Sequence, residues 1–200
     1  MPYHLYFDTE TTSLIPGQIC QLSYIKDGGR GIGAKNFFFT VDSMDPGAYK
    51  VHKLSLERLK ILSEGRRFSD CAEEIREDFA EAEMITAHNF RFDYMFVARE
   101  FERIGAQFRY KRGFCTMRYF VPHCKLGGTN RNAYKFPKLS ELGARFGVDA
   151  ADAAALTGDV FFADAADLHD ARYDASLMYL CVKKALKEEK DLKLLDKFTL

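Results

Sequence analysis

Tryptophan and long apolar runs are both missing from this sequence of 200 residues. No stretch approaches the roughly 18 consecutive apolar residues of a membrane-spanning helix, so we expect no membrane partner. Residues 1–8 contain no basic segment followed by an apolar one, so we expect no secretory signal peptide. The composition, 47% apolar and 29% charged, is typical of a folded chain and not of a disordered one.

Cysteine pairs of the C-x-x-C kind are absent as well. The five cysteines are odd in number and widely spaced, which argues against a disulfide framework and against a zinc site. Scattered thiols of this kind fit a reducing compartment, so we expect a cytoplasmic protein. The cysteines are Cys20, Cys71, Cys115, Cys124 and Cys181.

Net charge is the third absence, because 29 basic residues balance 29 acidic ones. A neutral chain argues against nucleic acid as a partner, but these charges are unevenly distributed. Between residues 107 and 145 the only acid is Glu141, so one face can be basic enough to contact phosphates. A solvated basic loop explains the same pattern equally well. The basic residues of this stretch are Arg109, Lys111, Arg112, Arg118, Lys125, Arg131, Lys135, Lys138 and Arg145.

The hydrophobic pattern predicts strands first, and then helices that alternate with strands. Residues 3–7, 18–26 and 35–41 are apolar and aromatic runs, and segment 27–31 predicts a hairpin loop longer than the tightest type. Helical signals follow at 54–62, 70–82, 92–104, 139–146 and 170–186, with strands at 84–87 and 114–117. Asp70 and Glu73 resemble a capping box at the start of the second helix.

This order of elements indicates an α/β protein. We expect three layers, α/β/α, on a mixed five-stranded sheet in which three antiparallel strands come first. Two hundred residues suit one ordinary domain, which we place at residues 1–186. Residues 187–200 are dense in charge and are expected to form a C-terminal helical extension.

Asp8-Thr9-Glu10 follows the first predicted strand. Residues i and i+2 of a strand point to the same face, so both carboxylates project together while Thr9 points away. Two close carboxylates raise each other's pKa unless a cation lies between them, and oxygen ligands suit Mg²⁺ or Mn²⁺. A D-x-E triplet is common, and a solvated strand end is the alternative interpretation.

Acids and histidines also stand at the start of two predicted helices. Asp93 falls in the first turn after strand 84–87, where a carboxylate also stabilises the helix dipole. Asp174 lies on an otherwise apolar helical face, where a buried acid needs a partner such as a metal. His169 precedes that helix and is either a surface residue or a base. His88 is interpreted as a structural histidine, and Asp170 as a helix-start residue.

Together these segments resemble the motifs of the DEDDh branch of the DnaQ-like 3′–5′ exonuclease superfamily. Phe-Asp-Thr-Glu-Thr-Thr (7–12), His-Asn-x-x-Phe-Asp (88–93) and His-x-x-x-x-Asp (169–174) match its three motifs in order and context. The resemblance covers about residues 3–186 and implies an RNase H-like fold. It also implies two divalent metal ions, Mg²⁺ or Mn²⁺, and a general base, His169. The implied metal ligands are Asp8, Glu10, Asp93 and Asp174.

The resemblance further implies residues that hold the terminal nucleotide. Residues 51–54 are similar to the family's V-H-G-I segment, so His52 is expected to contact the nucleotide, with Lys53 in place of the glycine. Leu14 takes the position of a wedge residue that packs on the terminal base. Thr9 through its main chain and Phe92 through its ring are the other expected contacts. Segment 136–142 is similar to a scaffold helix of the family.

The substrate is left open by the resemblance. The implied reaction is hydrolysis at the 3′ end of single-stranded nucleic acid, with DNA, in proofreading or repair, as the first expectation. RNA trimming and degradation of short oligonucleotides remain alternatives, because no residue identifies a contact to a 2′-hydroxyl. A non-catalytic module that binds nucleic acid or a polymerase is another alternative, against which the intact set of five motif residues argues. A DNA polymerase subunit and a second copy of the chain are the protein partners to consider.

Overall fold

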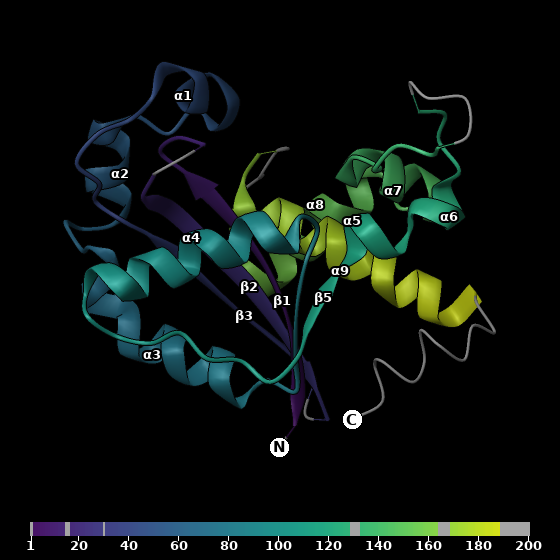
Figure 1. The fold of residues 1–200 in the computed structure, drawn as a ribbon, viewed down its shortest axis with the longest axis horizontal. Coiled ribbons are helices and arrows are strands. Elements are labelled where there is room, and N and C mark those ends of the chain that lie inside the picture. Colours follow the sequence, from purple (N-terminus) through teal and green to yellow (C-terminus); the bar gives the residue numbers. More distant parts are fainter. Residues whose placement is uncertain (1, 15–16, 30, 129–132, 164–168, 189–200) are drawn as a thin grey trace.

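A mixed five-stranded sheet forms the centre of the structure, a computed structural model that describes residues 2–14, 17–29, 31–128, 133–163 and 169–188. The strands lie in the order β3-β2-β1-β4-β5 (Figure 1). β1 (Tyr3–Thr11), β2 (Ile19–Gly28) and β3 (Gly31–Phe38) are antiparallel neighbours. β4 (Met84–Ala87) pairs with β1 in parallel, and β5 (Gly113–Cys115) pairs with β4 in parallel. The predicted strand order is therefore confirmed.

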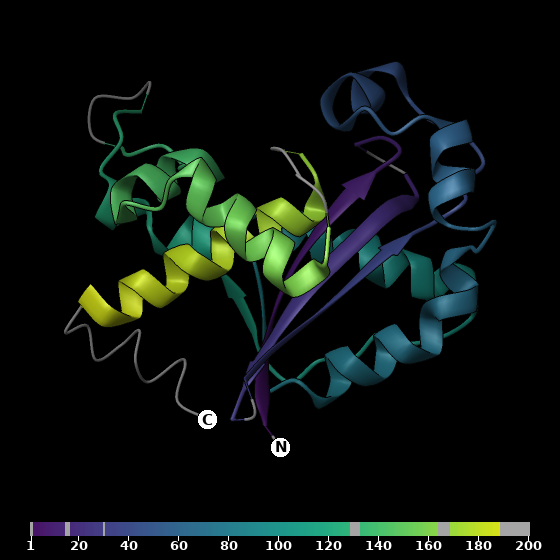
Figure 2. The same ribbon diagram turned by 180° about the vertical axis from the view of Figure 1, so that it is seen from behind.

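Helices cover both faces of the sheet and complete three layers (Figure 1, Figure 2). The helices are α1 (Pro46–His52), α2 (Leu56–Leu62), α3 (Phe68–Glu81), α4 (Phe90–Arg103), α5 (Thr116–Tyr119), α6 (Val121–Cys124), α7 (Leu139–Phe146), α8 (Ala150–Phe161) and α9 (Ala171–Glu188). α3 and α4 pack on one face, and α7, α8 and α9 pack on the other. None of the described helices has the length and apolarity needed to cross a membrane.

Alternation along β1 divides its side chains between the two layers. Leu5 and Phe7 are fully buried in the core shared with α3 and α4, whereas Tyr6 is buried in the core shared with α9. Burying each such side chain stabilises the fold by about 1.5–3 kcal/mol. Asp8 and Glu10 follow the period of Tyr6, so the same alternation directs both carboxylates to the α9 face.

Several boundaries differ from the sequence-based expectation. Gly28 pairs with Gly31, so only two residues connect β2 and β3, and the predicted longer hairpin loop is wrong. α3 begins at Phe68, so Asp70 is not its cap; its carboxylate accepts a hydrogen bond from Arg67 N at 2.7 Å from within the first turn. Residues 116 and 117, predicted as strand, lie in α5.

Among the helices that the prediction lacks are α1 and α8. Each begins after an aspartate whose carboxylate caps the helix. Asp45 Oδ1 accepts a hydrogen bond from Gly47 N at 2.7 Å, and Asp149 Oδ1 accepts one from Asp152 N at 2.8 Å. The C-terminal extension predicted for residues 187–200 lies outside the described residues from 189 onward, as do residues 129–132 of the basic stretch.

The basic stretch 107–145 is divided by β5, a strand at the edge of the sheet, so that its residues lie at both ends of that strand. Lys111 Nζ lies 2.7 Å from Glu83 Oε1, and Arg112 Nε donates to the Glu83 carbonyl oxygen, at the end of the sheet where β4 begins. Arg118 follows β5 and therefore lies at the opposite end, where β4 finishes. Lys111 and Arg112 therefore lie apart from Arg118, beside an acidic residue, and whether the stretch contacts phosphates stays a prediction.

Candidate active site

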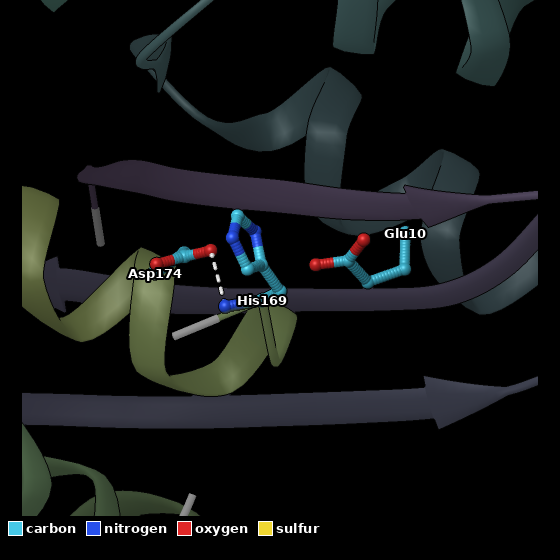
Figure 3. Close-up of side chains that lie close together, drawn as sticks. All are labelled: Glu10, His169 and Asp174. Atoms are coloured by element: carbon cyan, nitrogen blue, oxygen red, sulfur yellow. Dashed lines mark hydrogen bonds between the residues drawn. The ribbon is translucent and has the colours of Figure 1, made fainter. Parts of the chain in front are cut away.

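Glu10, His169 and Asp174 meet where the C-terminal end of β1 passes the start of α9. One ligand atom from each residue lies within 4.8 Å of those of the other two. Figure 3 shows the Glu10 carboxylate pointing toward the His169 imidazole, with Asp174 on the other side of the ring. Asp8, two residues earlier on the strand, lines the same pocket. The alternation predicted for the D-x-E motif therefore places both carboxylates beside α9.

Asp93 joins this group from the first turn of α4. Thr9 points to the opposite face of β1 from Asp8, and its hydroxyl donates to Asp93 Oδ1 at 2.7 Å. Asp93 is only 3% exposed, so this hydrogen bond fixes it inside the protein. One pocket of about 210 Å³ brings together all five residues of the predicted catalytic set. Its other lining residues are Thr9, His88, Asn89, Phe92 and Leu139.

Burial and mutual repulsion act together on the four carboxylates. Burial raises the pKa of Glu10 to about 9, with smaller contributions from neighbouring acids. Burial also raises the pKa of Asp93 to about 7 and that of Asp174 to about 7, against hydrogen bonds that lower both. The pKa of Asp8 is raised by burial first and then by the nearby charges. Four anions in this pocket are therefore unfavourable unless positive charge lies between them.

The donor atoms of the pocket fit divalent cations. Carboxylate oxygens are the ligands that Mg²⁺ and Mn²⁺ prefer. Asp174 Oδ1 is buried and has no hydrogen-bond partner among the described residues. A buried anionic oxygen without a partner is unfavourable, and a bound cation would satisfy it while relieving the repulsion among the acids. The acids that could hold such cations are Asp8, Glu10, Asp93 and Asp174.

His169 stands just before α9 in the left-handed region of backbone space, with φ at +67°. This conformation costs a residue with a Cβ on the order of 1 kcal/mol. The backbone N–H of His169 donates to Asp174 Oδ2 at 3.3 Å, while the residue itself stays exposed to solvent. Strain of this kind persists where the surrounding contacts impose it, and it is concentrated at functional sites.

A buried amide ties the start of α9 to the sheet. Gln21 on β2 pairs with Glu10 on β1 and is 1% exposed. Its Nε2 donates to Asp170 Oδ1 at 2.9 Å, and its Oε1 accepts from Ala171 N at 3.3 Å. Arg172 holds the same carboxylate from the other side, with Nη2 2.6 Å from Asp170 Oδ2. Asp170 is therefore a helix-start residue, as predicted, and it is engaged by side chains of the protein.

A second pocket of about 380 Å³ adjoins the first and shares Thr9, Glu10 and Phe92 with it. Leu14 and His52 also line this second pocket. Leu14 is 77% exposed, so its apolar side chain is presented to the cavity and not packed in the core. The four residues expected to contact a terminal nucleotide therefore meet in one cavity beside the carboxylates. Their role in binding stays a prediction.

His52 is buried under this second pocket with both ring nitrogens engaged. Leu54 N donates to Nδ1 at 3.1 Å, and Nε2 lies 3.3 Å from the Thr11 carbonyl oxygen. Because Nδ1 accepts a hydrogen bond, the ring proton belongs on Nε2, which donates it to Thr11. Burial lowers the pKa of His52, so the ring is neutral. A neutral ring with both nitrogens occupied can contact a ligand through its carbon edge or face.

His88 connects the site to the segment that precedes α7. Its Nε2 lies 2.9 Å from the Pro137 carbonyl oxygen, and its Nδ1 lies 3.0 Å from Thr116 Oγ1. Burial lowers the pKa of His88 to about 4, although the hydrogen bond to Pro137 acts in the opposite direction. The interpretation of His88 as a structural histidine is confirmed by these contacts.

Sequence reasoning missed the helix that builds one wall of the second pocket. Gly47, Ala48 and Val51 of α1 line the cavity together with Leu14. The available signal was the Asp45-Pro46 pair, because an aspartate cap followed by proline at the first helical position is typical of a helix start. Leu139, assigned to a scaffold helix, also lines the carboxylate pocket.

The same fold occurs in Escherichia coli exonuclease I. Its structure in complex with a dA16 oligonucleotide matches with a TM-score of 0.71 and 16% sequence identity, over 98% of this chain and 42% of that one. The zinc-bound form of its complex with single-stranded DNA matches with a TM-score of 0.72 and 17% identity, over 98% and 42% of the two chains. A structure of apo exonuclease I matches with a TM-score of 0.71 and 16% identity, over 98% of this chain and 44% of that one. No family model and no curated protein matches the sequence.

The class that these observations define is an α/β domain with the RNase H-like fold, as in exonuclease I. The fold implied by the sequence motifs is thereby confirmed. At 16% identity the likeness shows the fold alone. The chain spans less than half of the length of the exonuclease I chains that it matches.

Proposed function

We propose that this chain is a metal-dependent 3′–5′ exonuclease of the DEDDh branch, acting on single-stranded nucleic acid. One observation carries the proposal. The pocket that gathers four carboxylates and His169 shares Thr9, Glu10 and Phe92 with the pocket of Leu14 and His52. A reacting phosphate in the first pocket and a terminal nucleoside in the second would then be neighbours, which is the arrangement that removal of a terminal nucleotide requires.

Asp8, Glu10, Asp93 and Asp174 would hold two divalent cations, Mg²⁺ or Mn²⁺. Bound there, the cations would supply Lewis-acid chemistry, which activates water and stabilises charge on a departing oxygen. Thr9 contributes by holding Asp93 through its hydroxyl at 2.7 Å. Repulsion among the acids supports this role, because it disfavours the fully ionised pocket in the absence of cations.

His169 is the proposed general base. Its ring lies between two acids and is accessible to water, so a ring nitrogen can accept the proton of the attacking water molecule. The Leu14 side chain and the Phe92 ring would pack on the terminal base, and the neutral His52 ring would close the pocket beneath it. The main chain of Thr9 would contact the sugar.

DNA is the proposed substrate, in proofreading or repair, in the cytoplasm. The exonuclease I structures with a dA16 oligonucleotide and with single-stranded DNA give that substrate class a precedent in this fold. If the chain instead trims RNA or degrades short oligonucleotides, the proposed substrate is wrong. The proposal also includes a polymerase subunit or a second copy of the chain as a protein partner. No contact among the described residues identifies either one.

The direct test is incubation with Mg²⁺ or Mn²⁺ and end-labelled nucleic acids. Single-stranded DNA, duplex DNA, RNA and a dinucleotide are compared, with the label at either end. We expect mononucleotides to be released from the 3′ end of single-stranded DNA only when the metal is present. If the chain binds these nucleic acids but releases mononucleotides from none of them, it is a non-catalytic module.

Replacement of His169 separates chemistry from binding. His169→Ala is expected to lower turnover by about 10²–10⁴-fold, because a positioned base contributes that much, while Mn²⁺ and DNA binding stay near normal. Asp8→Ala should weaken Mn²⁺ binding in isothermal titration as well as activity. His123→Gln, a histidine outside the pocket, is the matched control and should retain activity. Normal turnover in His169→Ala would remove this residue from the mechanism.

A further inference from the structure

An exposed aromatic ring with a cation beside it lies at the edge of the candidate active site. Phe136 is 54% exposed, in the segment before α7. The guanidinium carbon of Arg118 lies 5.7 Å from the centroid of the Phe136 ring. A phenylalanine ring left in water forgoes the stabilisation of burial, and an arginine beside it adds a donor for phosphate. This pair has the composition of a surface that binds unpaired bases.

Both residues are fixed to the site through His88. Pro137, which follows Phe136, accepts the hydrogen bond of His88 Nε2 at 2.9 Å. Met117, which precedes Arg118, donates its backbone N–H to the His88 carbonyl oxygen at 3.1 Å. His88 in turn lines the carboxylate pocket. The backbone segments that carry Phe136 and Arg118 are therefore held in a set position relative to the carboxylate pocket.

The pair lies on the side of the site away from the Leu14 pocket. His88 and Leu139 line only the carboxylate pocket, whereas Leu14 and His52 line only the second pocket. Figure 1 and Figure 2 both show α1 on one side of the end of β1 and α5 with α7 on the other. A strand that places its last nucleotide against Leu14 and its last phosphate at the carboxylates would leave toward α5 and α7.

We propose that Phe136 and Arg118 form a stacking platform for an unpaired base upstream of the scissile phosphate, a role that rests on the proposed function. Phe136 would stack on the base, and Arg118 would contact the adjoining phosphate. Lys138, exposed two residues from Phe136, adds positive charge on the same segment. A base inside a duplex is already stacked on its neighbours, so the platform favours single strands that are longer than a dinucleotide.

Phe136→Ala is compared with wild type on a dinucleotide, on a single strand of about ten nucleotides and on the corresponding blunt duplex. The variant should raise KM for the longer single strand by about tenfold, in line with the contribution of one stacked base. Its kcat, and its rate on the dinucleotide, should stay within about twofold of wild type, because the platform lies outside the carboxylate pocket. The preference for single strand over duplex should fall in proportion. Phe136→Tyr should restore the wild-type KM.

Arg118→Gln tests the phosphate contact. Loss of one contact should reduce the dependence of log K on log salt concentration by about 0.7 for a single strand, measured by fluorescence anisotropy in Ca²⁺. Ile61→Ala, which removes a large exposed side chain from α2, is the matched control and should change neither KM nor salt dependence.

The two proposals fail in different ways. An active wild type whose KM for all three substrates is unchanged by Phe136→Ala overturns the platform and leaves the exonuclease standing. A wild type that hydrolyses nothing, yet binds the single strand about tenfold more tightly than Phe136→Ala, overturns the exonuclease and retains the platform. Melting temperatures of the variants verify that each one is folded.

Discussion

At the scale of single residues, the buried amide of Gln21 supports the candidate site from β2, a strand that supplies none of the four acids. It joins the sheet to the start of α9 by two hydrogen bonds, to Asp170 Oδ1 at 2.9 Å and from Ala171 N at 3.3 Å. His169 directly precedes this anchored pair. The orientation of the proposed base therefore depends on a hydrogen bond that reaches neither metal nor substrate, and Gln21 is a positioning residue.

Gln21→Met keeps the approximate volume of the side chain and removes both hydrogen bonds to the start of α9, together with the one to Asn36. We expect kcat to fall by about 10–100-fold, as is typical when a partner that orients a functional group is lost, with KM within about twofold of wild type. Steady-state kinetics on single-stranded DNA give both values. A structural defect alone would instead lower the melting temperature and leave kcat of the folded fraction intact.

Ser23→Ala is the matched control for that substitution. Ser23 is fully buried on the same strand, and its hydroxyl donates to Asn36 Oδ1 at 2.7 Å, the same acceptor that Gln21 uses at 2.9 Å. Among the described residues the Ser23 hydroxyl donates to Asn36 and not to α9, so Ser23→Ala should have a normal kcat. If Gln21→Met keeps the wild-type kcat while His169→Ala is inactive, Gln21 has no positioning role.

The residues of the candidate site differ in how far the sequence alone could identify them. Asp8 and Glu10 follow from the period of a strand, and Asp93 follows from the first turn of a helix. Gln21 gave no such signal, because its meaning depends on Asp170, which is 149 residues away. Contacts of that kind arise only when the layers are assembled.

At the scale of elements, the sequence predicts α7, which has eight residues, and misses α8, which has twelve, so length alone does not decide which helix can be predicted. α7 begins and ends where predicted, at residues 139–146, and Gly147 closes it with φ at +61°. The seven residues of α1, Pro-Gly-Ala-Tyr-Lys-Val-His, show no clear helical period of apolar positions, unlike the seven leucine-rich residues of α2. The cap and the proline of α1 were the local information available, and they lie outside any periodic segment.

The residue that follows the last turn of α1, Lys53, is poorly suited to the backbone conformation that it adopts. Lys53 takes the place of the glycine in the V-H-G-I segment that this sequence resembles. It adopts φ 61° and ψ 15°, and its N–H donates to Tyr49 O at 2.9 Å. Lys53→Gly should therefore stabilise the protein by about 0.5–1 kcal/mol, because glycine takes the left-handed conformation without steric cost. For a chain of this size the melting temperature should rise by about 1–4 °C.

Lys53→Ala distinguishes relief of backbone strain from loss of the lysine charge. Alanine keeps a Cβ and should give no such gain, while it removes the same positive charge as glycine does. Equal stabilisation by both substitutions would assign the effect to charge, and destabilisation by glycine would show that the lysine side chain itself supports the turn. Calorimetry of the three proteins under one set of conditions is sufficient.

At the scale of the whole molecule, the site exists only because three layers meet. β1 supplies Asp8 and Glu10 from the sheet, α4 supplies Asp93 from one face, and α9 supplies Asp174 from the other. No single element brings more than two of these acids together. The apolar cores on both sides of the sheet therefore hold the acids near one another against their repulsion, which lowers the stability of the protein without metal.

Because apolar burial holds the acids together against their repulsion, we expect the melting temperature to depend on bound metal. Saturating Mn²⁺ should raise the melting temperature of wild type by about 5–10 °C, because a ligand at a hundred times its dissociation constant stabilises the native state by about 2.7 kcal/mol. Burial, and then the neighbouring acids, raise the pKa of Glu10 to about 9, so at neutral pH and without metal Glu10 must take up a proton when the protein folds, which lowers stability; Glu10→Gln places a neutral group there and removes this cost. The variant should therefore melt above wild type without metal and gain less when Mn²⁺ is added, while losing activity.

Glu73→Gln provides the control for general charge effects, because Glu73 lies on the exposed surface of α3 and pairs only with Arg76 among the described residues. Its melting temperature should respond to Mn²⁺ as wild type does. If Mn²⁺ leaves wild type unchanged, or stabilises Glu10→Gln equally, the acids do not form a metal site. If Glu10→Gln melts below wild type without metal, Glu10 supports the fold and not a cation. The melting temperature without metal reports the cost of burying the acids together. The increase on adding Mn²⁺ reports how well the acids bind a cation.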